Sequence, residues 1–336
     1  MLKVKNVVAV AILFVAAGAM ASNFRAADQV YVPVAGHVAG ASQVFISDVF
    51  ISNLSNDSVS VSLIFSTGGA GTQTVFRDKI ALAAKERREI LDFFPTVLGL
   101  SSGIGQVIFN GCKQGGNCDV STCPNGATTG VCPDFRNISV ESRIYAIPVG
   151  STNPATAPTT GQLFSGIPWY NFVSSTASPV SLDKVQIVGF RNNASYRSNI
   201  GMVNASQFST TTLRVKLFDG ATGNQIGANF DQVLSPLGQV QSNVSAMFPT
   251  FSGGNAYVTV EQLNTQPTGD AAANFCGDGC PAFFCYGSVL DNQTGDATTL
   301  EAQYLVPLSD LGRDCIYNPG VNCKVGPIPI HRAVKH

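Results

Sequence analysis

The chain has 336 residues, of which 45% are hydrophobic and 12% are charged, and its formal net charge is −1. This balance excludes an intrinsically disordered chain, which combines low hydrophobicity with high net charge. It also lacks the basic excess with which proteins hold nucleic acid, so we expect no nucleic-acid partner. The length is sufficient for two hydrophobic cores of about 150 residues each.

The amino-terminal residues predict export. Lys3 and Lys5 give a basic start, residues 7–18 form an almost unbroken apolar run, and residues 19–21 read Ala-Met-Ala, a small-x-small cleavage site. The run is shorter than the roughly 20 residues that a membrane helix needs. We therefore interpret residues 1–21 as a signal peptide and expect no membrane span in the mature chain. The predicted location is secreted, extracellular or at the cell surface, with the periplasm as the alternative.

Cysteines in an exported chain are expected to be mostly paired, because oxidising compartments form and keep disulfides. The nine cysteines fall into three local groups: Cys112, Cys118, Cys123 and Cys132; Cys276, Cys280 and Cys285; Cys315 and Cys323. Local pairing would give Cys112–Cys118 with Cys123–Cys132, one of three connectivities open to the first group, and Cys315–Cys323. Cys285 is the candidate for the unpaired thiol, since it lies in a strand-like run while Cys276 and Cys280 flank a Gly-Asp-Gly turn.

The sequence contains an internal similarity. SDVFISNLSNDSVSVSLIF from Ser47 aligns with SNIGMVNASQFSTTTLRVKLF from Ser198, and FFPTVLGLSSGIGQVIF from Phe93 aligns with MFPTFSGGNAYVTV from Met247. These alignments predict two copies of one domain, separated near the Pro/Thr-rich residues 151–160. The expected boundaries are 22–160 for the first domain, with a Cys-rich insert at 112–132, then 161–311 for the second domain and 312–336 for a disulfide-stapled tail.

Within each copy the hydrophobic pattern predicts strands. Residues 59–65 and 213–217 alternate apolar with polar, and Gly- and Asn-rich turns separate such runs. Helical stretches are expected only briefly, around 91–98 and 242–248. The predicted fold is all-β, with two tandem immunoglobulin-like β-sandwich domains.

At this point the chain resembles a group of secreted bacterial β-sandwich repeat proteins. The residues that carry the resemblance are YVPVA from Tyr31, the SDVFISN strand from Ser47, an Ala-Leu-Ala turn before residues 87–91, and GSVLDNQTGD from Gly287. It covers roughly residues 30–110 and 137–306. It implies tandem immunoglobulin-like domains without an assigned reaction. The Cys-rich insert and the tail after Leu311 depart from the group.

The chain is poor in catalytic groups, and we expect neither an enzyme nor a cofactor. Its three histidines are His37, His331 and His336. Residues 99–103, GLSSG, match the G-x-S-x-G pattern of hydrolases, but that pattern acts only at a sharp strand-to-helix turn, and here a predicted strand follows it. An inter-strand loop is the favoured interpretation.

Two places offer metal ligands. Cys276, Cys280 and Cys285 could supply thiolates, although no fourth ligand follows at zinc-finger spacing, so disulfides are favoured. Asp291, Asn292 and Asp296 form a weak calcium candidate, because oxygen ligands suit Ca²⁺. The alternative is an Asx-rich hairpin turn, in which these side chains bond the local backbone. We assign no metal site.

The sequence therefore predicts a non-enzymatic secreted or surface-exposed structural and binding protein. One alternative is a self-assembling filament subunit joined by strand addition, with residues 30–32 as the donor; another is a carbohydrate-binding module protein. The expected partners are a further copy of the chain or an extracellular protein or glycan. The Cys-rich insert either presents a binding surface or protects a long loop. Sequons permit glycans at Asn53, Asn56, Asn137, Asn193, Asn204, Asn243 and Asn292.

Overall fold

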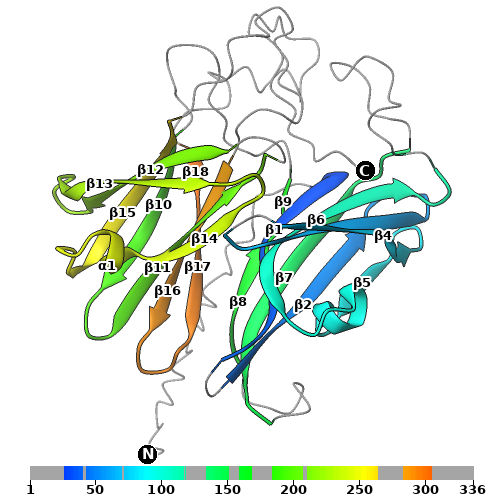
Figure 1. The fold of residues 1–336 in the computed structure, drawn as a ribbon, viewed down its shortest axis with the longest axis horizontal. Coiled ribbons are helices and arrows are strands. Elements are labelled where there is room, and N and C mark those ends of the chain that lie inside the picture. Colours follow the sequence, from blue (N-terminus) through cyan, green and yellow to red (C-terminus); the bar gives the residue numbers. More distant parts are fainter. Residues whose placement is uncertain are drawn as a thin grey trace, which may run out of the picture.

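The protein forms two β-sandwiches in tandem, which lie side by side in Figure 1. The computed structural model describes residues 26–40, 43–69, 72–116, 118, 134–150, 159–168, 184–206, 210–263 and 283–304. We call the described residues up to 168 unit 1 and those from 184 onwards unit 2. Most of them lie in antiparallel strands, which confirms the all-β sandwich class expected from the alternating sequence pattern.

Unit 1 consists of two sheet layers joined by hydrogen bonds. Its elements are β1 (Gln29–Ala39), β2 (Gln43–Asn53), β3 (Val59–Thr67), β4 (Gln73–Leu82), β5 (Arg87–Ile90), η1 (Phe94–Leu98), β6 (Gly103–Lys113), β7 (Ile138–Pro148), β8 (Thr160–Ser165) and β9 (Ile167–Pro168). One layer has the order β4-β3-β6-β1, with β9 beside β1, and the other has the order β5-β2-β7-β8. The end of β1 also pairs with the start of β2, which joins the layers.

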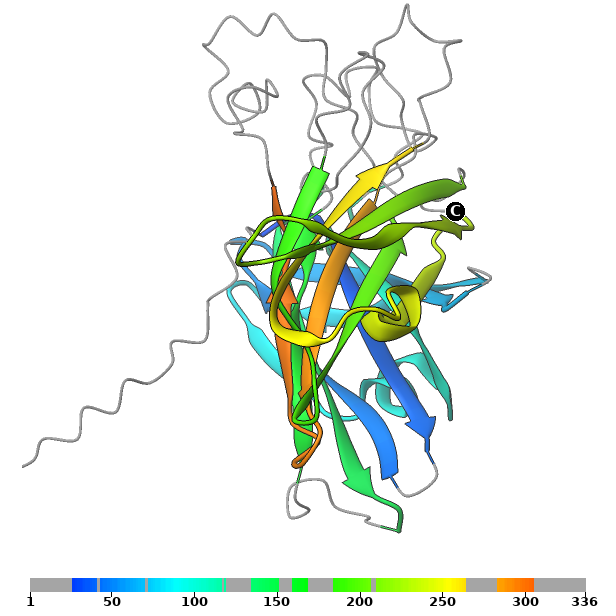
Figure 2. The ribbon, with the colours of Figure 1, turned by 90° about the vertical axis from the view of Figure 1, so that its left-hand side faces the viewer.

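Unit 2 follows the same strand order. Its elements are β10 (Lys184–Asn192), β11 (Tyr196–Asn204), β12 (Thr211–Asp219), β13 (Gln225–Leu234), β14 (Gln239–Asn243), α1 (Val244–Met247), β15 (Gly253–Gln262), β16 (Phe283–Asp291), β17 (Ala297–Glu301) and β18 (Gln303–Tyr304). The layers are β13-β12-β15-β10-β18 and β14-β11-β16-β17. Figure 2, in which unit 2 faces the viewer, shows unit 1 behind it.

The central pairings of both units are those of immunoglobulin-type sandwiches. In such domains strands B, E and D are neighbours in one sheet, while C, F and G are neighbours in the other. The order β1-β6-β3 in one layer of unit 1 and β2-β7-β8 in its other layer reproduces both sets. In unit 2 the corresponding orders are β10-β15-β12 and β11-β16-β17.

Alternation along the strands builds each core. In β12, Leu213, Val215 and Leu217 are buried between the layers, whereas Arg214 and Lys216 face outwards. Each fully buried aliphatic side chain of this kind contributes about 1.5–3 kcal/mol to stability. The same alternation in β3 buries the side chains that form the core of unit 1.

The two short helical turns occur where the sequence predicts them. Pro95 lies in the first turn of η1, and Gly99 ends the turn in a left-handed conformation with φ of 69°. The side-chain oxygen of Asn243 caps α1 by accepting a hydrogen bond from the backbone N–H of Ser245. Both turns connect a strand of one layer to a strand of the other.

A buried asparagine has the same role in both units. The side-chain oxygen of Asn53 accepts from the backbone N–H two residues later at 2.9 Å, and its amide donates to Ala83 O at 2.8 Å. In unit 2, Asn204 accepts from the N–H two residues later at 2.9 Å and donates to Ser235 O at 2.8 Å. Each asparagine therefore fixes the turn that precedes β5 or β14.

A buried serine also has the same role in both units. Ser47 Oγ accepts a hydrogen bond from the backbone N–H of Gly36 at 2.8 Å, and Ser198 Oγ accepts one from Arg191 N–H at 2.9 Å. Each bond ties β2 or β11 to the strand before it. The serine and the asparagine of the aligned sequence segments are thus structural residues.

Candidate functional site

Titratable side chains gather in unit 1 where the corner after β5 packs against β1, β2 and β7. His37 Nδ1 lies 2.8 Å from Asp92 Oδ1. The backbone N–H of Asp92 donates to Asp48 Oδ1 at 3.0 Å, and the Tyr145 hydroxyl donates to the same oxygen at 3.1 Å. Asp92 has a left-handed φ of 45°, a conformation that these hydrogen bonds hold in place. We call these four residues the His37–Tyr145 cluster.

Burial governs the electrostatics of the His37–Tyr145 cluster. Burial raises the pKa of the Asp48 carboxyl, and the hydrogen bonds from Asp92 and Tyr145 partly oppose this shift. Burial and the neighbouring Asp48 also raise the pKa of the Tyr145 phenol, which therefore stays protonated and donates. The Arg143 guanidinium lies 4.6 Å from the centroid of the Tyr145 ring. Because Asp48 Oδ1 already accepts two hydrogen bonds, this oxygen acts as an anchor for the corner.

The serines of the G-x-S-x-G pattern lie on a helix-to-strand connection. Gly99 ends η1, and Gly103, with φ of 148°, begins β6. A nucleophile elbow requires the reverse order, a strand followed by a helix. Ser101 and Ser102 are exposed in this loop, and His37 is the register partner of Gly103 on the adjacent strand. The geometry is that of an inter-strand loop.

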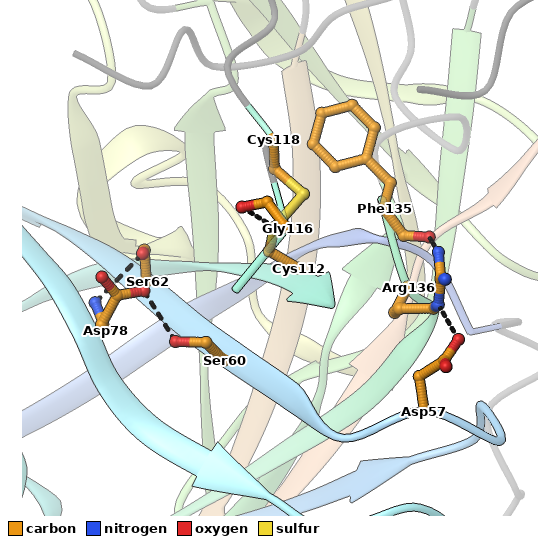
Figure 3. The surroundings of a disulfide bond; sticks show 9 residues. All are labelled: Asp57, Ser60, Ser62, Asp78, Cys112, Gly116, Cys118, Phe135 and Arg136. Carbon is orange, nitrogen blue, oxygen red and sulfur yellow. Dashed lines mark hydrogen bonds and ion pairs between the residues drawn. A yellow bond between two sulfur atoms is a disulfide. The ribbon is translucent and has the colours of Figure 1, made fainter. Parts of the chain in front are cut away.

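One disulfide lies at the end of β6. Cys112 and Cys118 are bonded, with their Cα atoms 5.9 Å apart, and Figure 3 shows the bond beside Phe135. The next residue, Arg136, donates from Nε to Asp57 Oδ2 at 2.7 Å. The sequence-predicted disulfide cysteines that lie outside the described residues are Cys123, Cys132, Cys276, Cys280, Cys315 and Cys323.

Cys285 is a free thiol buried in the core of unit 2. Burial raises its pKa, so the sulfur is kept in the neutral, unreactive form. The six cysteines outside the described residues follow β6, β15 and β18 in the sequence.

The calcium candidate lies in the hairpin between β16 and β17. Asp291 Oδ1 accepts from the backbone N–H groups of Gln293 and Thr294, at 2.7 and 3.2 Å. Asn292 Oδ1 accepts from the Arg197 guanidinium at 2.7 Å. These oxygens are engaged within the chain, as in an Asx turn. Across the part of the chain that the structure describes, no group of three His, Cys, Asp or Glu side chains is placed to hold a metal ion.

The outer strands β4 and β13 carry matching bulges. The register of β3 with β4 shifts just after Val61, and that of β12 with β13 shifts just after Val215. Inside the bulges, Asp78 has φ of 48° and Gly227 has φ of 71°. Bulges and charged side chains on an edge strand hinder the addition of a strand from another chain.

Residues 30–32, the donor segment of the strand-addition hypothesis, are already paired. They lie in β1, with β6 on one side and β9 on the other. Val30, Tyr31 and Val32 are all buried. Donating this segment to another chain would remove the central strand of its own sheet.

A buried apolar interface joins the two units through the outer faces of two sheet layers. Its members are Tyr31, Val34, Ile64, Ile108, Phe164 and Ile167 of unit 1 with Val203, Ala205, Leu237, Phe284 and Tyr286 of unit 2. Two edge-to-face ring contacts cross it: Tyr31 with Phe284, with centroids 6.2 Å apart, and Phe164 with Tyr286 at 5.0 Å. Such pairs add about 0.5–1.5 kcal/mol beyond the area that they bury.

Hydrogen bonds lock this interface. Gln106 Nε2 and Ser66 Oγ both donate to Leu237 O, at 2.6 and 2.9 Å. The backbone N–H of Gly69 donates to Gln239 O at 2.8 Å. An apolar interface with directional bonds allows little relative motion of its domains. The interface therefore restrains the relative motion of the two sandwiches.

Within the described residues, no helix is both long and apolar enough to cross a membrane. Comparison with known proteins finds no family model that matches the chain and no match among curated proteins.

Proposed function

We propose that the protein is a non-enzymatic structural and binding protein that is secreted or exposed at the cell surface. The observation that carries this proposal is the interface between the units, because it turns two sandwiches into a rigid support with a fixed shape. A support of this kind presents contact surfaces in constant relative positions. The expected ligand is an extracellular protein or a glycan.

The proposal includes a tandem origin of the two units. It is supported by the matching strand order, by the bulges at the same place in β4 and β13, and by the shared roles of Asn53 and Asn204. The export signal at residues 1–21 belongs to the same proposal. The resemblance to secreted bacterial β-sandwich repeat proteins supports both parts.

Cell fractionation tests the location. The full chain is expected in the culture medium, or on intact cells in a form that added trypsin removes. A control protein of the cytoplasm must survive the same trypsin treatment. Accumulation of the chain with the cytoplasmic control would overturn the proposal.

A hydrolysis screen tests the absence of catalysis. The purified chain and its His37→Ala variant are compared on ester, peptide and glycoside substrates. His37, which is hydrogen-bonded to Asp92 in the His37–Tyr145 cluster, is the histidine of the described residues that could serve as a general base. We expect no saturable turnover from either protein. Saturable turnover that disappears in His37→Ala would show an enzyme.

A further inference from the structure

Unit 2 carries an apolar row on the outer face of β10, β15 and β12. Val188, Tyr257 and Phe218 are direct register partners across these strands. Val188 is 42% exposed, and the partly exposed rings of Phe218 and Tyr257 stack with centroids 5.0 Å apart and 11° between their planes. We call these three residues the unit 2 row.

The remaining exposed apolar side chains of unit 2 lie on the same face. Val233 of β13 pairs with Thr212, which alternates with the buried Leu213 and so points outwards. Leu263 directly follows the buried Gln262, and its N–H donates to Thr212 O. Among the described residues of unit 2, all the exposed large hydrophobic side chains thus lie on one face, with Val233 and Leu263 about 20 Å along β12 from the unit 2 row. Gathered apolar groups mark interaction sites, whereas single ones do not.

The counterpart of the unit 2 row in unit 1 is an occupied docking surface. Tyr31, Ile108 and Ile64 are register partners on β1, β6 and β3, at the positions that match the row. All three are buried under the outer face of unit 2. This position in the sandwich therefore receives the face of another sandwich.

The charges around the unit 2 row suit a second copy of the same face. Lys184 and Lys216 each contact Glu261 at 2.8 Å, and Arg214 contacts Asp231 at 2.8 Å. A face with both signs interspersed does not select a strongly acidic or basic partner. Since each of these charges has a partner on its own face, an identical face can stack there by a two-fold rotation without burying an unpaired charge.

A head-to-tail contact with another chain is disfavoured. Unit 1 is held by an apolar face of unit 2 that carries Val203, Phe284 and Tyr286. By strand order and register, the matching positions of unit 1 are Ser52, Ser139 and Glu141. These three polar positions of unit 1 cannot replace the apolar contact, and the apolar face of unit 2 is already covered.

We propose that the protein dimerises through the unit 2 row, with the same face of a second copy stacked on it. Four strands about 4.8 Å apart, each contributing about six residues of 3.4 Å, give a face of roughly 20 Å by 20 Å. This size is at the low end for specific interfaces. The expected dimer is therefore weak, with a dissociation constant of about 10–100 µM.

Sedimentation equilibrium of the full chain tests the dimer over about 1 µM to 1 mM, which brackets the expected dissociation constant. Val188→Lys places a charge in the centre of the contact and is expected to weaken dimerisation at least about tenfold. Val188→Thr, which keeps the strand-forming shape, is expected to weaken it less. Leu54→Lys is the matched control, because Leu54 is 47% exposed and lies in unit 1, outside the unit 2 row. We expect it to change nothing.

Each outcome decides the proposal. A dimer weakened by both Val188 variants and not by Leu54→Lys supports it. A monomer at every concentration overturns it, and so does a dimer that a folded Val188→Lys variant leaves intact, whatever the effect of Leu54→Lys. Circular dichroism establishes that each variant is folded. If Val188→Lys does not fold, Val188→Thr still tests the contact. The location and hydrolysis tests of the proposed function do not depend on this result.

Discussion

The outer faces of the two units differ where their strand positions correspond. In unit 1, Tyr31, Ile64 and Ile108 are covered by the other sandwich, whereas the unit 2 row is open to solvent. On the other outer face of each sandwich the difference is reversed, because there the residues of unit 2 are covered and those of unit 1 are open. Unit 2 has Phe284 and Tyr286 in the interface where unit 1 has serine and glutamate in contact with solvent.

The side chains of the two units follow their surroundings even where the strand order is the same. Aromatic and aliphatic residues occupy the positions that become buried between units, since removal of apolar area from water is favourable. The residues with identical roles in both units, Asn53 and Asn204, are identical. Residues with the same structural role are therefore identical in the two units, whereas outer-face residues that are buried in only one unit differ.

The largest expected effect comes from placing a charge on the covered row. Ile108→Lys buries an unpaired ammonium in the interface and is expected to cost about 3–5 kcal/mol. Tyr257→Lys at the matching position of unit 2 leaves the charge in water in the monomer and removes the stacking on Phe218, at an expected cost of about 1 kcal/mol. Urea unfolding followed by circular dichroism measures both. Equal losses would contradict the assignment of one row as covered and the other as open.

The shared asparagines are expected to matter equally. Asn53→Ala and Asn204→Ala each leave buried backbone groups without partners, at a cost of about 1–3 kcal/mol in unfolding free energy. The exposed Asn56 provides the control, since Asn56→Ala is expected to change the unfolding free energy by less than about 0.5 kcal/mol. A loss confined to one of the two buried positions would show that the units do not use this residue alike.

A smaller contrast is expected at two residues with left-handed backbone. Lys85, with φ of 61°, precedes β5 in unit 1, and Leu237, with φ of 49°, precedes β14 in unit 2 and is buried in the interface. Lys85→Gly relieves backbone strain and is expected to add about 0.5–1 kcal/mol of stability. Leu237→Gly relieves the same strain but loses apolar burial, so a net loss of about 1–2 kcal/mol is expected. Differential scanning calorimetry gives both values.

If the interface is as described, Lys85→Gly must raise the free energy of unfolding and Leu237→Gly must lower it. A stabilising Leu237→Gly would mean that this side chain contributes little to the contact between the units.

The smallest expected effect is a pH dependence confined to unit 1. Burial raises the pKa of the Asp48 carboxyl above its ordinary value of 3.8 in the folded chain. As the pH rises, this carboxyl therefore loses its proton in the unfolded chain at a lower pH than in the folded chain. Relative to Asp48→Asn, which keeps an oxygen acceptor, the natural chain should lose stability from about pH 4 upwards. Below about pH 3 both states are protonated, and the two proteins should differ by a constant amount. Denaturant midpoints measured across this range provide the test, and a pH-independent difference would contradict the burial of Asp48.

The local pattern predicted much of the fold. Period-two alternation indicated the strands, and brief apolar stretches around residues 91–98 and 242–248 indicated the helical turns now seen as η1 and α1. These features depend on neighbouring residues, which a sequence displays directly. The alignment of Asn53 with Asn204 also placed together two residues that have the same hydrogen bonds.

The arrangement of the units was not predictable in this way. Tyr31 alternates with inward-facing valines as any outward-facing strand residue does, and nothing in its neighbourhood indicates that another sandwich covers it. The His37–Tyr145 cluster likewise unites residues from β1, β2, β7 and the corner after β5. Contacts of this range are set by the docking of distant segments, for which a single sequence carries no periodic signal.

The strands β9 and β18 have a consequence for protein engineering. Each follows the last long strand of its unit and pairs with the first, β1 or β10. The chain therefore enters and leaves each sandwich at neighbouring points, a property that favours domain insertion and circular permutation. In each unit the two ends therefore lie close together, which is the geometry that insertion into the surface loop of a host protein requires. A permutant that joins β9 to β1 and opens the chain in the loop before β6 would keep all the strand pairings of unit 1.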